Sequence, residues 1–314
     1  MSKINVAVLG CGFWGKNHAR VLSEIENCNL LAVADVNGEK ARSIGEKYYI
    51  RWYTDPSKII ERKEIELINI CTPTITHAEL ALEAIEAGKH VLVEKPMTNT
   101  LEEATKVNKA AKKKSVHIMV GFIERFNPAV KKAEELISNG EIGSIVLASS
   151  RRVSRWPQRI GDVGVVKDLA IHGIDLSCHL FKQEVEQVYA VTGSLAHKFE
   201  DYANITLRFK DSRSAFIEAN WLTPRKVRRL TITGTEGMIQ LEYITQTVTV
   251  ENQKETFTPF FEQQEPLKLE LEHLINFILK DDDPTPSGED GLRALRICDA
   301  ALRSGQTHKP ENLK

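Results

Sequence analysis

The feature that most constrains the fold is a set of three glycines directly after a segment rich in apolar side chains. Residues 4–9 form that segment, and Gly10, Gly12 and Gly15 follow in the spacing G-x-G-x-x-G. In dinucleotide-binding turns the first glycine permits a tight turn, the second lets the backbone approach a pyrophosphate, and the third lets helix and strand pack closely. The pyrophosphate then lies on N–H groups at the helix N-terminus. The run therefore predicts a strand, a turn and a helix that bind a dinucleotide.

An acidic residue lies at the distance that such a site requires. A second apolar stretch, Leu30 to Ala34, ends at Asp35, 20 residues beyond Gly15. A carboxylate there accepts hydrogen bonds from both ribose hydroxyls and repels the 2′-phosphate of NADP, so it favours NAD. Lys40 and Arg42 follow closely enough to keep NADP as an alternative.

Length, charge and cysteine usage restrict the class of protein. The chain has 314 residues, 42% hydrophobic and 27% charged, which is enough for two globular domains. Its 42 basic and 43 acidic residues nearly balance, which disfavours nucleic acid or an anionic membrane as a partner. The five cysteines are scattered and predict reduced core thiols. A first strand at Ile4 leaves no room for a signal peptide, and no apolar run approaches the roughly 18 residues of a membrane span, so we expect a cytoplasmic protein.

Two patterns divide the chain. Up to residue 121 apolar segments alternate with helical stretches, and the segments are centred near Val6, Leu31, Ile68, Val91 and Ile118. Segments that are apolar on both faces are typical of a parallel sheet covered by helices, so residues 1–121 predict a doubly wound Rossmann domain of the α/β class. Residues 122–314 combine helices with alternating runs such as Ala203 to Phe209, which predicts an α+β domain with antiparallel strands.

Two short motifs lie at the carboxyl ends of predicted strands, where open α/β sheets bind ligands. Thr72-Pro73-Thr74 with His77 follows one strand, and Glu94-Lys95-Pro96 follows the next. Oxidation of an alcohol by hydride transfer requires a group that takes the hydroxyl proton, and Lys95 suits that role if burial lowers its pKa. The alternative is a solvated lysine at a strand end.

A third motif places Asp168, His172 and Asp175 at i, i+4 and i+7, so they are expected on one face of a helix whose other face is apolar and packs on the sheet. His172 would then exchange a proton in the cleft. A metal site that includes His179 is the competing interpretation, but at ~1.5 Å per residue the two ends lie ~16 Å apart, so one ion cannot bind all four. Two ligands from this helix, or a purely structural His172, stay open.

Two further segments carry polar residues that suit an anionic ligand. The stretch Arg151 to Arg159 contains four arginines and Trp156, which suit a diphosphate and a stacked base, although an exposed basic loop would have the same sequence. Arg125 and Asn127 lie in the segment that joins the two domains and are expected at the interdomain cleft, where a hinge is the alternative.

Together the three motifs resemble the Gfo/Idh/MocA oxidoreductase family over essentially the whole chain. The resemblance implies a Rossmann domain, a second domain with a large, mostly antiparallel open sheet that forms a homodimer or homotetramer, and NAD(P)-dependent chemistry on sugars or cyclitols. Lys95, Asp168 and His172 match the catalytic positions of the family. Thr74 stands where many members have Asn, which weakens the inferred contact at that position.

The motifs and the resemblance together define the candidate site. The residues expected at the cofactor are Gly10, Gly12, Phe13, Trp14, Gly15, Asp35, Thr72, Pro73, Thr74, His77, Glu94, Lys95 and Arg125. The residues expected at the substrate are Lys95, Arg125, Asn127, Arg152, Arg155, Trp156, Asp168 and His172. No metal is expected.

Within the family, Arg125 to Pro128 and Arg151 to Asp175 look most like the UDP-N-acetylglucosamine 3-dehydrogenases. That resemblance implies that the arginines hold UDP and that the sugar 3-hydroxyl is oxidised to a ketone. The alternatives are oxidation of a free sugar or a cyclitol such as myo-inositol, and a non-catalytic regulator that senses NAD.

Overall fold

The chain forms two compact units in the computed structural model, which describes residues 3–157, 161–280, 282 and 285–313. Unit 1 comprises Met1–Phe122 and Leu267–Leu292, and unit 2 comprises Ile123–Pro266 and Arg293–Lys314. The first crossing between the units lies one residue after the expected boundary at residue 121. Residues 267–292, which the sequence pattern assigned to the second domain, group with unit 1, so the chain crosses three times.

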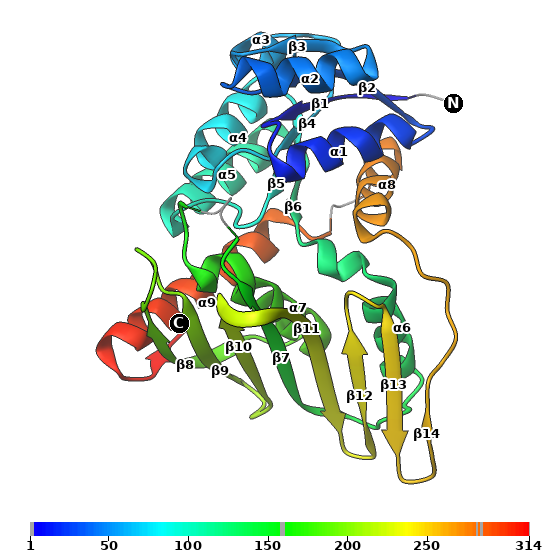
Figure 1. Cartoon of the computed structure of the whole chain (residues 1–314), viewed down its shortest axis with the longest axis vertical. Coiled ribbons are helices and arrows are strands. Elements are labelled where there is room, and N and C mark those ends of the chain that lie inside the picture. The colour runs from blue at the N-terminus through cyan, green and yellow to red at the C-terminus, as the bar shows by residue number, and fades with distance from the viewer. Residues whose placement is uncertain (1–2, 158–160, 281, 283–284, 314) are drawn as a thin grey trace. The chain divides into compact units, whose positions relative to one another are not determined.

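Unit 1 is built on a six-stranded parallel sheet, drawn in blue to cyan in Figure 1. Its strands are β1 (Ile4–Leu9), β2 (Cys28–Ala34), β3 (Arg51–Tyr53), β4 (Leu67–Ile70), β5 (His90–Glu94) and β6 (Ile118–Gly121). They lie in the order β3-β2-β1-β4-β5-β6, so the direction of winding reverses between β1 and β4. Every residue of β4 is buried, as a strand covered on both faces requires. The predicted Rossmann fold is confirmed.

Helices connect these strands and complete the unit. They are α1 (Phe13–Glu24), α2 (Gly38–Tyr48), α3 (Ser57–Ile60), α4 (His77–Glu86), α5 (Leu101–Lys114), most of α8 (Pro266–Lys280) and the start of α9 (Gly288–Thr307). The returning segment is tied to β6, since the N–H of Val120 donates to the carbonyl of Pro286 at 3.0 Å. Leu271 and Leu274 of α8 are buried. Unit 1 therefore combines the strands of residues 4–121 with helices from residues 267–292, near the other end of the chain.

Unit 2 is built on a nine-stranded mixed sheet. Its strands are β7 (Ile145–Arg155), β8 (Val185–Gly193), β9 (Tyr202–Phe209), β10 (Ser214–Asn220), β11 (Leu222–Gly234), β12 (Gly237–Glu242), β13 (Thr247–Asn252), β14 (Thr256–Phe257) and β15 (Glu311–Asn312). They lie in the order β14-β13-β12-β11-β7-β10-β9-β8-β15. Among the described strands of this sheet, β7 and β10 form the one parallel pair. The predicted α+β domain with a large, mostly antiparallel sheet is confirmed.

Helix α7 (Ile171–Phe181) packs on one face of this sheet, against β7 and β10. A Cβ atom built on Gly173 would lie 2.7 Å from Ser150 Oγ, so α7 approaches β7 more closely there than a larger residue permits. Helix α6 (Pro128–Ser138) lies against β12 and β13, and the C-terminal part of α9 belongs to the same unit. Among the described residues no helix is long and apolar enough to cross a membrane.

Candidate functional site

The glycine turn after β1 has the geometry that its sequence predicts. Gly10 has φ +90°, and a Cβ atom there would lie 2.7 Å from the Cys71 backbone. A Cβ atom on Gly15 would lie 1.7 Å from the carbonyl oxygen of Gly10, so close packing of α1 on β1 excludes any side chain. In contrast, no described atom lies within 4 Å of a Cβ built on Gly12. The fold requires the first and third glycines, whereas the second leaves open space, as a bound pyrophosphate would require.

The N-terminus of α1 lies at that open space. Gly12 is the N-cap residue, and the first turn contains neither a side-chain cap nor an acidic residue among those described. The positive end of the helix dipole is therefore left for an external anion. Phe13 is exposed and contacts Trp14 edge to face, with ring centroids 5.4 Å apart.

Asp35 is oriented by backbone groups on both sides. Its Oδ2 accepts a hydrogen bond from the N–H of Cys11 at 2.7 Å, and its Oδ1 accepts one from the N–H of Asn37 at 2.8 Å. The Cys11 bond links the carboxylate directly to the glycine turn. Burial, together with the charge of Asp35, raises the pKa of the Cys11 thiol to about 12, so this thiol is neutral at pH 7.

The loops after β4 and β5 are joined by His77. Its Nε2 lies 2.9 Å from the carbonyl oxygen of Thr72, and its Nδ1 lies 2.9 Å from that of Pro96. Carbonyl oxygens only accept, so both bonds form together only when the ring is protonated on both nitrogens. Thr74 is buried beside this bridge and Lys95 is half-buried. His77, which sequence reasoning placed at the cofactor, thus holds the two motif loops together.

The segment with Asp168 and His172 differs from the predicted regular helix. Residues Val166–Ala170 form a π turn, and the α-helix proper begins at Ile171. The polar face is not open to solvent, because α7 is buried at every residue except His179, and its place at the substrate stays a prediction. Asp168, His172 and Asp175 are all buried in unit 2. The alternation of polar and apolar residues in this segment reflects polar contacts inside the unit, which a two-sided helix pattern does not reveal.

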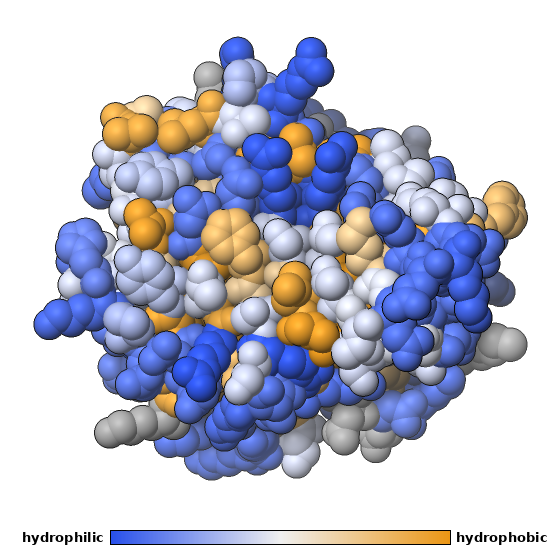
Figure 2. Space-filling view, turned by 90° about the horizontal axis from the view of Figure 1, so that it is seen from below, coloured by the Kyte–Doolittle hydropathy of each residue, from blue (hydrophilic) through white to orange (hydrophobic). Residues whose placement is uncertain are grey.

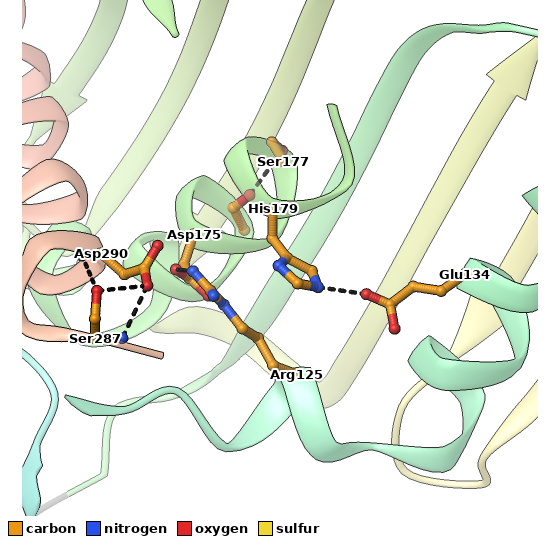
Figure 3. A network of polar contacts seen from close by, with 8 residues as sticks. Arg125, Glu134, Asp175, Ser177, His179, Ser287 and Asp290 are labelled. Carbon is orange, nitrogen blue, oxygen red and sulfur yellow. Dashed lines mark hydrogen bonds and ion pairs between the residues drawn. The ribbon is translucent and has the colours of Figure 1, made fainter. Parts of the chain in front are cut away.

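Asp175 and Arg125 form a buried ion pair (Figure 3). Arg125 donates from Nε to Oδ2 at 2.8 Å and from Nη2 to Oδ1 at 2.5 Å, with side-chain exposures of 5% and 2%. Such a two-pronged pair fixes the planes of both groups. In the same view His179 points to Glu134, with which it is hydrogen bonded. Two of the four residues of the alternative metal site are therefore engaged elsewhere, and no group of three or more potential ligands occurs among the residues described.

Asn127 has structural partners on three sides. Its Oδ1 accepts from the N–H of Ala129 and caps α6, and its Nδ2 lies 3.1 Å from the carbonyl oxygen of Tyr243 and 3.2 Å from Glu124 Oε2. These bonds explain why an asparagine follows the domain crossing. Its expected contact with substrate stays a prediction.

The basic stretch is largely a strand, because β7 extends to Arg155. Arg151 is exposed and pairs with Glu218 at 2.9 Å, whereas Arg152 is buried and donates from Nη1 to Glu124 Oε1 at 2.8 Å. Neighbouring residues of a strand point to opposite faces, so these arginines do not form one patch. Arg155 is exposed, while Gln158 and Arg159 lie outside the described residues.

Trp156 lies in an aromatic group that the sequence does not reveal. Its ring is 4.4 Å from that of His197, which in turn lies 5.9 Å from the ring of Trp221. Trp156 is 39% exposed, whereas Trp221 is buried. The Trp156 ring is therefore a partly exposed flat surface, and the rings of His197 and Trp221 pack next to it.

Sequence reasoning also missed Arg228, a buried residue of β11. Its Nη1 donates to the carbonyl oxygen of Val153 at 2.9 Å. Burial and the positive charge of Arg152 lower its pKa to about 10, although the negative charge of Asp168 opposes this change. Arg228 thus places a positive charge near Asp168. The alternating pattern of β11 was a signal that could have identified it, since Arg228 falls two residues before the buried Leu230.

Comparison with known proteins gives consistent matches along the chain. Residues 4–122 match the Gfo/Idh/MocA model, described as an oxidoreductase family with an NAD-binding Rossmann fold, and residues 130–240 match the model of the Gfo/Idh/MocA C-terminal domain. Myo-inositol 2-dehydrogenase of Thermotoga maritima is 30% identical over 96% of each chain. UDP-N-acetylglucosamine 3-dehydrogenase of Acidithiobacillus ferrooxidans is 25% identical over 96% of each chain. The structure of levoglucosan dehydrogenase in complex with NADH superposes with a TM-score of 0.93 at 24% identity and covers 100% of both chains.

Proposed function

Because the chain belongs to the Gfo/Idh/MocA oxidoreductase family, we infer that it is an NAD-dependent dehydrogenase that oxidises a CH–OH group of a sugar or cyclitol. The observation that carries this proposal is the contrast among the three glycines. Only Gly12 opens onto space outside the chain, at a helix N-terminus and beside an oriented carboxylate. This arrangement suits a dinucleotide, whose pyrophosphate would lie at Gly12 and whose ribose would lie at the carboxylate.

The residues present fit NAD better than NADP. Both oxygens of Asp35 are already oriented by backbone N–H groups, so the carboxylate is ready to accept ribose hydroxyls. Arg42, one of the two cations that would favour a 2′-phosphate, donates from Nε to Glu46 Oε1 at 2.6 Å. Lys40 is exposed and keeps NADP as the alternative. When bound, NAD supplies the hydride acceptor at C4 of its nicotinamide ring.

Transfer of the hydroxyl proton is the step that side chains of this protein must carry out. The substrate hydroxyl must lose a proton as its carbon loses a hydride, and Lys95 with His172 are the groups that we assign to receive and pass on this proton. Asp168 orients them or the substrate, and Arg228 places a positive charge near Asp168. Positioned acid–base groups of this kind contribute roughly 10²–10⁴-fold to a rate.

For the substrate we propose UDP-N-acetylglucosamine, oxidised at its 3-hydroxyl. Arg155 is exposed at the end of β7, and the half-exposed Trp156 next to it rests on His197. A guanidinium beside a flat aromatic face suits a diphosphate and a stacked base. The relative from Acidithiobacillus ferrooxidans, which carries the name of this activity, aligns along nearly its whole length.

A free cyclitol is the second candidate, and the position of Arg152 favours it. Arg152 is buried, ion-paired with Glu124 and located 5.3 Å from the centre of the Tyr243 ring. An arginine held in this way has one side of its guanidinium already occupied, so it is poorly placed to bind a diphosphate. Myo-inositol 2-dehydrogenase of Thermotoga maritima is also the more similar of the two named relatives.

Absorbance at 340 nm separates these proposals. Purified protein and NAD are mixed with UDP-N-acetylglucosamine, UDP-glucose, myo-inositol or glucose, with 2-oxoglutarate and an aminotransferase present to consume a keto product. NADH formed only with UDP-N-acetylglucosamine supports the narrow proposal, and Arg155→Ala and Trp156→Ala should then raise KM. NADH formed with inositol or glucose supports the second candidate, and these variants should then leave KM unchanged. A protein that binds NAD but forms no NADH in any mixture would favour an untested substrate or a regulator.

We also propose a homodimer or homotetramer formed through the uncovered face of the nine-stranded sheet. Phe216, Thr206 and Tyr189 lie side by side on β10, β9 and β8, and both aromatic side chains are more than 40% exposed. Figure 2 shows one face of the molecule, on which apolar side chains lie near the centre and again toward the edges. Exposed apolar patches of this kind mark association surfaces. Light scattering with chromatography tests this, since Phe216→Asp should yield monomers.

A further inference from the structure

A buried histidine of α1 links the cofactor-binding helix to the Lys95 segment. His18 is 0% exposed, and its Nε2 lies 3.1 Å from Glu94 Oε1. Its Nδ1 lies 3.2 Å from Asn69 Nδ2. The three side chains come from α1, β4 and β5, so the contact joins three elements of unit 1 beneath the glycine turn.

The partners of His18 fix which of its nitrogens carries the proton. The amide nitrogen of Asn69 donates, so Nδ1 of His18 accepts and bears no hydrogen. The ring hydrogen is then on Nε2, from which it is donated to Glu94. His18 therefore orients the Glu94 carboxylate through a directed hydrogen bond.

Glu94 passes this constraint to Lys95. Its side chain is buried, and its second oxygen, Oε2, lies 3.2 Å from the backbone nitrogen of Lys95. On the side of β6 the carboxyl group is confined, because a Cβ atom built on Gly121 would lie 3.1 Å from Glu94 Cδ. The carboxylate is thus held between the His18 ring and the Lys95 N–H.

The other side of Lys95 is held as well. The carbonyl oxygen of Pro96 lies 2.9 Å from Nδ1 of His77, which fixes the backbone after Lys95. The Glu94 backbone is itself paired with Gly121 in β6, so loss of the His18 bond would free only the Glu94 carboxylate. That carboxylate could then leave the Lys95 N–H, and the Lys95 side chain would lose one of the contacts that set its direction.

We propose that His18 is a positioning residue for Lys95, acting through the Glu94 carboxylate. The inference rests on the proposed function, in which Lys95 is an acid–base group. Helix α1, whose N-terminus is proposed to bind the pyrophosphate, then has a second role. Its buried His18–Glu94 hydrogen bond sets the direction of the Lys95 side chain.

Two variants that differ by one methylene test this. In His18→Gln the amide nitrogen reaches the place of Nε2 and still donates to Glu94, whereas the shorter amide of His18→Asn stops at the place of Nδ1. His18→Asn should lower kcat by about 10- to 100-fold, the range expected when a reacting group is displaced by ~1 Å. His18→Gln should recover most of that loss, and NADH affinity should stay near that of the wild type in both. Leu22→Ala, buried one turn further along α1, controls for a loosened helix and should keep kcat.

A second readout requires no substrate. The rate at which an acylating reagent labels the Lys95 amine, followed by mass spectrometry across pH, should change several-fold in His18→Asn and stay near the wild-type rate in His18→Gln and Leu22→Ala. Equal labelling and equal kcat in the two His18 variants would overturn the inference. If the wild type and all variants turn over none of the tested substrates, but the labelling of Lys95 changes in His18→Asn alone, the positioning role stands and the proposed substrates are wrong.

Discussion

The backbone N–H of Cys11, inside the glycine turn, donates a hydrogen bond to Oδ2 of Asp35 at 2.7 Å. The two halves of the sequence fingerprint, separated by 24 residues, are therefore one physical unit: the turn that would hold the pyrophosphate also orients the carboxylate that would hold the ribose.

This relationship predicts the effect of removing the carboxylate. Asp35→Ala should weaken NAD binding at least tenfold, because two oriented acceptors for ribose hydroxyls disappear, and should reduce the preference for NAD over NADP. Titration of NADH fluorescence with both dinucleotides measures this. Asp211→Ala is the matched control, since Asp211 is exposed and also accepts a backbone N–H, from Arg213 at 3.3 Å, but belongs to unit 2. Equal NAD affinity in both variants would contradict the assignment of Asp35.

Substitution of Gly15 and substitution of Gly12 should have different effects, the first on stability and the second on NAD affinity. Gly15→Ala should destabilise unit 1 strongly, because the new Cβ atom would lie 1.7 Å from a backbone oxygen. Gly12→Ala should fold with near-normal stability, because its Cβ atom meets no described atom within 4 Å, and should instead lose NAD affinity. Thermal unfolding and NADH titration separate the two. A Gly12→Ala protein that binds NAD normally would remove the main support for the site.

The proposed acid–base groups predict a loss confined to turnover. Lys95→Met and His172→Gln should each lower kcat by roughly 10²–10⁴-fold, while NADH affinity changes little. Steady-state kinetics with the active substrate, combined with NADH titration, measures both quantities. Unchanged kcat in both variants would show that other residues move the proton.

The buried ion pair predicts a stability defect in unit 2. Asp175→Asn leaves the Arg125 guanidinium buried without its counter-ion and should cost about 3–5 kcal/mol in the free energy of unfolding. Arg125→Met combined with Asp175→Leu, which removes both charges, should be less harmful than either single change. Urea unfolding of the single and double variants measures the coupling, and additive losses would rule it out.

Glu200 predicts a stability effect that depends on pH. Burial raises the pKa of this carboxyl group above its ordinary value near 4.5, although its Oε1 accepts the N–H of Val166 at 3.1 Å. The folded state then binds a proton more tightly than the unfolded state, so stability falls as pH rises from about 4.5 through the folded pKa and is constant above it. Glu200→Gln keeps an acceptor for Val166 and carries no charge. It should be more stable than the wild type at pH 7 and approach it near pH 4 in thermal unfolding experiments.

The sequence predicted well those features that depend on local backbone geometry. Gly10 and Gly15 are required by contacts within the chain, and a fully apolar segment such as β4 indicates a strand buried on both faces. The short edge strand β3 was missed because three residues are too few to show an alternating pattern, although Trp52 and Tyr53 are residues that favour strands.

Features that depend on distant partners were not predictable in the same way. Arg152 is buried with Glu124 as its ion-pair partner, and Arg228 is buried with the carbonyl of Val153 as its hydrogen-bond acceptor. No local sequence pattern identifies these partners. Helix α7 is buried at every residue except His179, so the i, i+4, i+7 spacing did not reveal which groups surround its polar side chains. His18 was not singled out, because its partner Glu94 is 76 residues away.

The return of residues 267–292 to unit 1 has a consequence for synthesis on the ribosome. Strand β6 is complete at Gly121, but the partner of Val120, Pro286, is made only after the whole of residues 123–266 has been added. At about 5–20 residues per second this interval lasts roughly 10–30 s. During that time β6 lacks its hydrogen-bond partner Pro286, and unit 1 lacks the buried side chains of α8 such as Leu271 and Leu274. Fragments that stop after residue 122 should therefore be poor mimics of the NAD-binding unit, however complete their glycine turn.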